Sequence, residues 1–254
     1  MQQQPANRTK NTPMHLHKAR SLLLWYGLVK PMIVKREAAA QTTMKKTTDN
    51  SISRRLFITG SLAFTAMPAL AQDGDIFSEQ MIWRDPSIPV AGNVKGDLTI
   101  VEYSDFNCPY CRKVFPVMQK VVREDGNIRL VYKLWPIFGP ASVYSAQLVL
   151  ATRGQGKYVQ AYDALMSSTS RVTEAGADKT LAAAGIDVSR AKQDLQKNKS
   201  EIETILKRHH AQADGFSFQG TPSFIIGKFR LFGAHDEEVF KQAIADARKM
   251  LKGG

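Results

Sequence analysis

The only two cysteines of the 254-residue sequence, Cys108 and Cys111, stand three residues apart in the run CPYC. Pro109 favours the first turn of a helix, and cysteines three apart at a helix start lie on one turn, close enough for their sulfurs to bond. Unpaired N–H groups and the helix dipole stabilise an anion at that end. We therefore expect Cys108 to be an exposed nucleophile with a pKa below about 8.5, and Cys111 to be the more buried resolving thiol.

Two other uses of the cysteine pair are less favoured. A structural disulfide across two intervening residues closes so small a loop that it restricts the unfolded chain very little. A metal site needs further ligands, and His209, His210 and His235 have no ligand spacing to the cysteines. We therefore expect thiol–disulfide exchange, with no metal and no cofactor other than a redox-active Cys108–Cys111 disulfide.

The hydrophobic pattern around the cysteines predicts an α/β fold. Apolar residues at three- and four-residue spacing indicate helices, and short runs rich in β-branched and aromatic residues indicate strands. Two such runs flank the helix that starts at the cysteines, which makes a β-α-β unit with a crossover. The predicted elements are a strand at 98–103, a helix from 109 to about 124, a strand at 128–134, a helical stretch over 139–214, a hairpin of 224–226 and 229–232, and a helix at 236–251.

Two segments show less regular patterns. Within the helical stretch, Gly185-Ile186-Asp187 separates two further helices, of which the last extends to about Ala213. The segment 72–97, which follows the N-terminal leader, contains several prolines and glycines and shows little periodicity. We expect it to be an extended lead-in to the domain, which then spans residues 72–254.

Two motifs far apart in the sequence resemble those of the DsbA-like thioredoxin-fold proteins. They are IVEYSDFNCPYCR at 100–112 and GTPSF at 220–224, separated by the helical stretch. The resemblance covers most of residues 85–252. It implies a thioredoxin fold (β-α-β followed by β-β-α around a mixed central sheet) with an all-helical insertion over about 139–214, and thiol:disulfide oxidoreductase activity.

The resemblance also implies how substrate is held. The family's proline that matches Pro222 is cis and faces the cysteine pair, whereas without the cysteines an ordinary trans proline at a strand start would be expected. Thr221, before it, can offer its N–H and C=O to an extended substrate chain. We expect substrate contacts from Thr221 and Pro222, together with Pro109 and Tyr110 between the cysteines.

Glu102 is an acidic residue in an otherwise apolar strand, six residues before Cys108. Burial of a charge is costly, and the family has a buried acid at the matching position that moves protons to and from the inner cysteine. The resemblance therefore implies that Glu102 is a proton relay with a raised pKa. The alternative is a solvated strand end with an exposed Glu102. Asp105, closer to the cysteines, is expected to shape the loop.

The formal net charge of +12 is concentrated in the first 71 residues, which hold 11 lysines and arginines against 2 acidic residues. The remainder, with 24 basic and 21 acidic residues, is near balance. A basic leader followed by a balanced domain argues against nucleic-acid binding.

The leader has the form of an export signal. Arg54 and Arg55 precede a short apolar run over 56–66, and Ala69 and Ala71 fit the preference of signal peptidase. We expect a bacterial twin-arginine signal over 51–71, cut after Ala71, with a general secretory signal as the alternative. Because Met44 is followed by two lysines, as a conventional signal start would be, we expect that residues 1–43 are not translated.

The sequence therefore predicts an exported periplasmic thiol:disulfide oxidoreductase that acts on cysteine-containing protein substrates, as an oxidase of the DsbA type. A membrane redox partner would restore its cysteines, and we expect a monomer. Tyr110 stands where the best-known oxidases have a histidine, and a neutral tyrosine supplies no imidazolium to the thiolate. A reductase or isomerase therefore remains an alternative, as does a non-enzymatic binding or chaperone module with a structural disulfide.

Overall fold

The computed structural model describes residues 75–253. The export signal expected at 51–71, its cleavage after Ala71 and the untranslated segment expected at 1–43 lie outside the described residues. Of the helices between residues 75 and 253, none combines the length and the apolar character needed to cross a bilayer.

A five-stranded mixed sheet forms the centre of the domain, in the order β1-β3-β2-β4-β5. The two central strands, β2 and β3, are parallel, and the other neighbours are antiparallel. Both central strands are buried along almost their whole length, as expected for strands that are covered on both faces. The strands are β1 (Val90–Gly92), β2 (Leu98–Ser104), β3 (Ile128–Leu134), β4 (Ser223–Ile226) and β5 (Phe229–Phe232).

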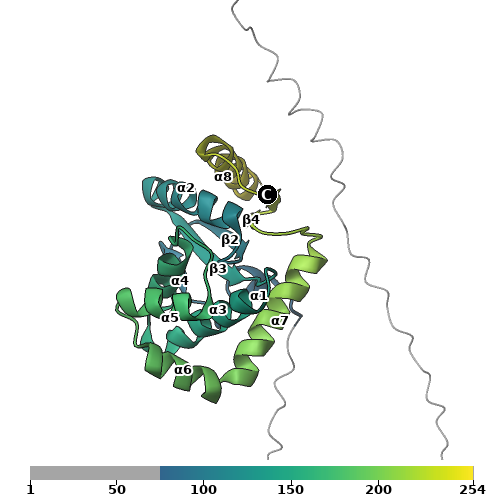
Figure 1. The fold of residues 1–254 in the computed structure, drawn as a ribbon. Coiled ribbons are helices and arrows are strands. Elements are labelled where there is room, and N and C mark those ends of the chain that lie inside the picture. The colour runs from purple at the N-terminus through teal and green to yellow at the C-terminus, as the bar shows by residue number, and fades with distance from the viewer. Residues whose placement is uncertain (1–74, 254) are drawn as a thin grey trace, which may run out of the picture. The chain divides into compact units, whose positions relative to one another are not determined.

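Helices cover both faces of this sheet (Figure 1). Two long helices, α2 (Pro109–Asp125) and α8 (Glu237–Lys252), lie side by side on one face, where Phe224 of β4 packs edge-on against Phe240 of α8. Successive side chains of a strand point to opposite faces. Tyr103 accordingly points to the other face, where its hydroxyl donates to Gln212 of α7 (Lys199–Gly215).

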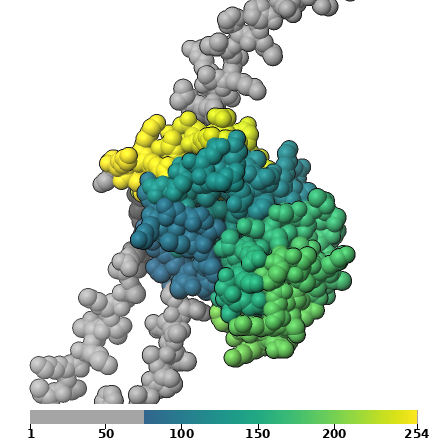
Figure 2. Space-filling model, turned by 90° about the vertical axis from the view of Figure 1, so that its left-hand side faces the viewer, coloured from purple at the N-terminus to yellow at the C-terminus, as the bar shows by residue number. Residues whose placement is uncertain are grey.

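The helical insertion lies between β3 and β4 in the chain and forms a lobe beside the sheet, shown in green in Figure 2. It starts at Pro140 and ends at Gly215, which agrees with the expected bounds of 139–214. Before α7 it consists of α3 (Pro140–Ala151), a short 3₁₀ turn (Thr152–Gln155), α4 (Tyr158–Met166), α5 (Glu174–Ala183) and α6 (Val188–Lys197). The fold class predicted from the sequence, a thioredoxin fold with an all-helical insertion, is confirmed.

One break in the insertion was not predicted. The sequence indicated a single helix after Asp187, but the structure has two, α6 and α7, which are separated at Asn198. Asn198 leaves the helical conformation, and its N–H still caps α6 by bonding to the carbonyl of Asp194. One polar residue between two helices barely changes the spacing of the apolar residues, so the hydrophobic pattern does not reveal the break.

The expectation of an extended lead-in over 72–97 is wrong for part of that segment. It contains the helix α1 (Glu79–Trp83) and the edge strand β1, both too short to show a period. Asp85 fixes this segment: its carboxylate lies 2.9 Å from Arg208 Nη2 and 3.7 Å from the buried Lys133 Nζ. Burial lowers the pKa of Lys133 to about 7. The backbone carbonyl of Met81 and the side-chain amide oxygen of Gln212 accept hydrogen bonds from its Nζ.

Candidate active site

Cys108 occupies the N-cap position of α2, as its place before Pro109 predicted. Its backbone is extended, its N–H donates to the carbonyl of Asp105, and its Sγ accepts a hydrogen bond of 3.4 Å from the N–H of Cys111. The two cysteines are not bonded to each other in this structure. The sulfur of Cys108 therefore caps one of the free N–H groups at the helix start, which is the position that stabilises a thiolate.

The loop before β4 brings Thr221 and Pro222 to the cysteines across more than a hundred residues. The Thr221–Pro222 peptide bond is cis, as the resemblance implied. Cys108 Sγ lies 3.1 Å from the carbonyl oxygen of Thr221, to which it donates a hydrogen bond when it is in the thiol form. Ser223 then enters β4 opposite Tyr103 of β2, and its hydroxyl bonds back to the carbonyl of Gly220. The antiparallel pairing of β4 with β2 is what holds this loop over the start of α2.

Cys108 is less exposed than the sequence predicted. It is only 1% exposed, and the carbonyl oxygen of Thr221 lies against its sulfur, so the expectation of an exposed sulfur is wrong for this structure. The next two residues, Pro109 and Tyr110, are exposed, and Tyr110 is 62% exposed. Cys108 thus lies directly beneath the surface. Cys111, one turn further along α2, is fully buried, as expected for the inner thiol.

The two thiols have opposite acidities. A hydrogen bond from the Cys111 thiol, assisted by the backbone N–H groups of Cys111 and Tyr110, lowers the pKa of Cys108 to about 6 against the effect of burial. Burial raises the pKa of Cys111 well above its ordinary value, and the charges of Cys108 and Glu102 raise it further. At neutral pH the outer sulfur is therefore a thiolate and the inner one a thiol, which is the arrangement that thiol–disulfide exchange needs.

Glu102 is buried beneath the cysteine pair and is not exposed at a solvated strand end. Burial raises its pKa to about 8. The nearby Tyr162 hydroxyl partly opposes this rise in the pKa of Glu102. The hydrogen bond of that hydroxyl, however, is to Ser104 Oγ. Among residues 75–253, neither carboxylate oxygen of Glu102 has a hydrogen-bond partner. Glu102 is therefore held as a protonated acid. When it ionises, its negative charge raises the pKa of Cys111.

Asp105 and Asn107, which precede the cysteines in the chain, hold the active-site loop in place. Asp105 was expected to shape this loop, and its carboxylate accepts hydrogen bonds from the N–H groups of Asn107, Ile137 and Phe138. Asn107 was not singled out from the sequence. Its buried side chain reaches across to Ser142 of α3 in the helical insertion. An asparagine before a cysteine carries no recognisable signal, because its partners lie in a separate part of the chain.

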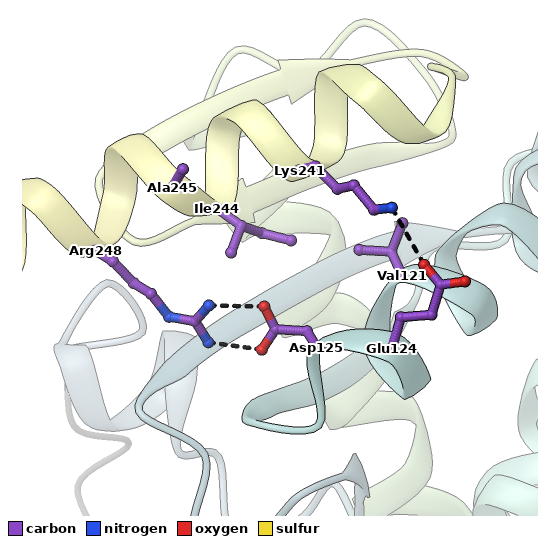
Figure 3. A pocket seen from close by; sticks show the side chains of 7 residues that line it. All are labelled: Val121, Glu124, Asp125, Lys241, Ile244, Ala245 and Arg248. Carbon is purple, nitrogen blue, oxygen red and sulfur yellow. Dashed lines mark hydrogen bonds and ion pairs between the residues drawn. The ribbon is translucent and has the colours of Figure 1, made fainter.

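Other candidate positions lie away from the cysteines. Within the described part of the chain, no three histidine, cysteine or acidic side chains come together as metal ligands. His209 is buried against the carbonyl of Leu134, and His210 accepts a hydrogen bond from the indole of Trp135. A pocket of about 350 Å³ lies between α2 and α8 (Figure 3). It is at the far end of α2 from the cysteines, and ion pairs such as Arg248–Asp125 cross it.

A thioredoxin-type sheet, two cysteines at the start of the helix after its first central strand, and a cis-proline loop facing them define the class of thioredoxin-fold thiol:disulfide oxidoreductases. Within that class, the chain belongs to the family described as "DSBA-like thioredoxin domain", which matches residues 99–245.

Relatives of known structure and name are consistent with this assignment. A thioredoxin-like oxidoreductase from Silicibacter pomeroyi is 35% identical, with a TM-score of 0.65, and the match covers 68% of this chain and 98% of that one. The "Probable disulfide bond formation protein D" of Bacillus anthracis is 25% identical over 148 residues, which are 53% of this chain and 67% of the relative.

Another set of curated relatives consists of longer proteins. The "Na(+)/H(+) antiporter NhaA 1" of Salinispora arenicola is 26% identical over 160 residues, which are 62% of this chain and 24% of that protein. The chain thus spans between about a quarter and a third of the length of the curated antiporters it matches.

Proposed function

We propose that this chain exchanges disulfides with cysteine-containing protein substrates through Cys108 and Cys111, and that it acts as an oxidase of the DsbA type. The observation that carries this proposal is the position of the Cys108 sulfur. It lies at the helix start, 3.1 Å from the carbonyl of Thr221, and its pKa is lowered to about 6. A thiolate of this acidity is both a nucleophile and a good leaving group.

In the oxidising direction, a substrate thiolate attacks Sγ of Cys108 in the oxidised pair. The Cys108–Cys111 bond breaks, a mixed disulfide forms, and the Cys111 sulfur leaves with the electron pair. Because the pKa of Cys111 is raised, this sulfur takes a proton, and Glu102 is the acid beneath it. The second substrate thiolate then attacks the substrate sulfur of the mixed disulfide and releases Cys108 as a thiolate. The substrate leaves oxidised, and the pair is reduced by two electrons.

Substrate binding follows from the same loop. The backbone of Thr221 and the exposed Pro109 and Tyr110 border the covered sulfur, so an extended peptide beside Thr221 would place its own cysteine against Cys108. Residues Thr221, Pro222, Pro109 and Tyr110 are therefore the proposed substrate contacts.

Reduction of insulin disulfides, followed by turbidity, tests this proposal. The wild type is expected to accelerate insulin reduction by a dithiol, and Cys108→Ser is expected to abolish the acceleration. Cys111→Ser leaves the nucleophile in place and is expected to accumulate a mixed disulfide with substrate, visible by mass. Equal acceleration by the wild type and Cys108→Ser would support a module with a merely structural disulfide and would refute exchange chemistry.

The direction of exchange has one alternative with an observation in its favour. Tyr110 is neutral and points away from the core, so no imidazolium in the dipeptide between the cysteines stabilises the reduced pair. This favours a less oxidising couple, as in a reductase or isomerase. Equilibration of the purified protein with glutathione of known redox ratio gives the reduction potential. A reduction potential close to those of strongly oxidising couples supports oxidase function. A potential close to that of thioredoxin supports reductase or isomerase function.

We further propose that the domain works in the periplasm as a monomer, and that a membrane redox partner reoxidises it. The Arg54-Arg55 pair and the small residues at Ala69 and Ala71 support export. The test is fractionation of cells that express the full chain, with Arg54 and Arg55 both changed to lysine as the comparison. Loss of the periplasmic form in the double variant supports twin-arginine export, and unchanged export supports the general secretory route.

A further inference from the structure

The carbonyl of Thr221 reaches the Cys108 sulfur from a short loop, residues 216–222, that joins α7 to β4. The side chain of Thr221 does not fix this loop, because among residues 75–253 its hydroxyl oxygen is buried without a hydrogen-bond partner. Other residues must therefore set the position of the carbonyl.

The end of α7 gives the loop its direction. The N–H of Ser217 donates to the carbonyl of Asp214, and the N–H of Phe218 donates to the carbonyl of Ala213. This pair of bonds is the Schellman arrangement of a helix end, which needs a residue in the left-handed conformation. Ser217 supplies it with a φ of 59°, and within the described part of the chain no other residue except glycine has a positive φ. The turn directs Phe218 back toward the sheet.

The ring of Phe218 packs above a row of three residues on neighbouring strands. Tyr103 of β2 lies opposite Ser223 of β4, and Ser223 lies opposite Phe232 of β5, so the three side chains point to the same face. The middle side chain is small, whereas its two neighbours are aromatic. Phe218 is 4% exposed and packs edge-on against both Tyr103 and Phe232, with ring centroids 5.4 Å apart in each pair. The buried ring thus connects the loop to two strands of the sheet.

Two hydrogen bonds hold the rest of the loop to the same strands. The hydroxyl of Ser223 donates to the carbonyl of Gly220 at 2.7 Å. The N–H of Gly233, which follows β5, donates to the carbonyl of Pro222 at 2.8 Å. These bonds fix the backbone on both sides of Thr221, and the aromatic packing fixes how the loop approaches them.

We propose that Phe218 sets the position of the Thr221 carbonyl against the Cys108 sulfur and so controls access to that sulfur. This inference rests on the proposed function. Without the ring, the loop moves away from the start of α2. A small reagent then reaches the sulfur more easily, while the Thr221 backbone no longer presents a fixed edge to an extended substrate. Phe218 acts through the backbone of Thr221, so it is a positioning residue and not a catalytic one.

Alkylation of the reduced protein by iodoacetamide, followed by mass as a function of pH, tests the inference. The rate reaches a plateau where Cys108 is fully ionised, so the plateau reports access to the sulfur and the midpoint reports its pKa. Phe218→Leu removes both aromatic pairs and is expected to raise the plateau about tenfold, and Phe232→Ala removes one pair and is expected to raise it about threefold. Phe240→Leu removes a buried ring from the other face of the sheet, and this matched control is expected to behave as wild type.

Insulin reduction gives a second readout that a general loss of stability would not produce. Phe218→Leu is expected to raise the KM for insulin by a factor similar to the rise in the alkylation plateau, with little change in kcat, because the ring positions the backbone that receives the substrate and not the reacting sulfurs. An unchanged KM in a variant with a raised plateau would overturn the part of the inference that concerns substrate.

The outcomes separate this inference from the proposed function. If the wild type reduces insulin but the plateau is not raised in Phe218→Leu, or is raised equally in Phe240→Leu, the inference alone fails. A shifted midpoint without a raised plateau also overturns it. Should circular dichroism show that Phe218→Leu does not fold, Phe232→Ala decides, because its ring is 43% exposed and its removal leaves the core filled. If the wild type does not reduce insulin, the proposed function fails and this inference fails with it.

Discussion

Asn107 and Val172 are joined by two hydrogen bonds across 65 residues of sequence. The side-chain amide nitrogen of Asn107 donates to the carbonyl of Val172 at 3.0 Å, and its oxygen accepts from the N–H of Val172 at 2.8 Å. Both residues are buried. The residue directly before Cys108 thus pairs with the backbone between α4 and α5, so the helical insertion and the active-site loop are held as one unit.

Replacement of Asn107 by alanine is expected to lower the free energy of unfolding by at least about 2 kcal/mol. The change leaves the N–H and C=O of Val172 buried without partners, and each such group costs about 1–3 kcal/mol. Urea denaturation measures the loss. Ser142→Ala removes only the bond of 3.2 Å from the Asn107 amide and serves as the control, with an expected loss of about 1 kcal/mol or less. Equal losses in the two variants would show that the pairing with Val172 contributes little.

The acidity of Cys108 is expected to depend on its neighbour. Thiolate absorbance near 240 nm, measured as a function of pH on the reduced protein, should give a pKa of about 6 for Cys108. Cys111→Ala removes the thiol that donates to this sulfur, so its pKa should rise toward the ordinary value. Cys111→Ser keeps a donor at the same place and should preserve most of the effect. An unchanged pKa in Cys111→Ala would indicate that the helix start alone lowers it.

The ionisation of Cys108 should contribute stability to the reduced protein that grows as the pH rises from about 6 to about 9. The pKa of Cys108 is about 6 in the folded protein and 9.0 for an unperturbed thiol, so the folded state releases its proton first. The resulting stability is fully present above the unfolded value and is lost as the pH falls through the folded one. Urea denaturation of the reduced wild type and of Cys108→Ser at several pH values isolates this contribution, which the variant should lack.

Glu102 should have the opposite effect on stability. Its pKa is raised from 4.5 to about 8, so the folded state holds a proton that the unfolded chain releases. The stabilisation that Glu102 contributes is fully present below pH 4.5 and is lost as the pH rises through about 8. The loss is up to about 1.4 kcal/mol for each pH unit between these two pKa values. Because other groups also titrate in this range, the informative quantity is the difference between the oxidised wild type and Glu102→Gln. A difference that does not change with pH would mean that Glu102 titrates normally.

The ion pairs between α2 and α8 should matter for stability but not for chemistry. The guanidinium group of Arg248 bonds to both carboxylate oxygens of Asp125 and also to Asp97, as the pair in Figure 3 illustrates. Arg248→Ala is expected to lower the free energy of unfolding by about 1–2 kcal/mol. Lys249→Ala, which removes an exposed pair of 3.5 Å with Asp246, should change it by less than about 0.5 kcal/mol. The reduction potential should be the same in both, because the cysteines lie at the other end of α2.

The sequence predicted the elements that position the cysteines, because each has a strong local signal. The strand at 128–134 was predicted with the bounds that the structure shows, and the helix after Pro109 to within one residue. The fold class and the cis bond before Pro222 came from two motifs whose spacing is typical of the family. These features depend on residues close together in the chain or on a pairing of motifs.

The features that could not be predicted arise from contacts between distant residues. The contact between the Cys108 sulfur and the carbonyl of Thr221 is one example, since no sequence pattern specifies where a carbonyl points. The role of Asn107 depends on the packing of the helical insertion against the active-site loop. The short elements α1 and β1 are held by partners of Asp85 that lie far away in the sequence, such as the buried Lys133, and not by a period of their own.

The acidities at the site leave it with a single negative charge at neutral pH. In the reduced protein Cys108 is ionised, while Cys111 and Glu102 keep their protons. In the oxidised protein the same three residues are uncharged. The two redox forms therefore differ by one electronic charge in an otherwise unchanged molecule. Cation-exchange chromatography at neutral pH should resolve them without any label, and the two peaks should merge below pH 5, where the outer sulfur is protonated.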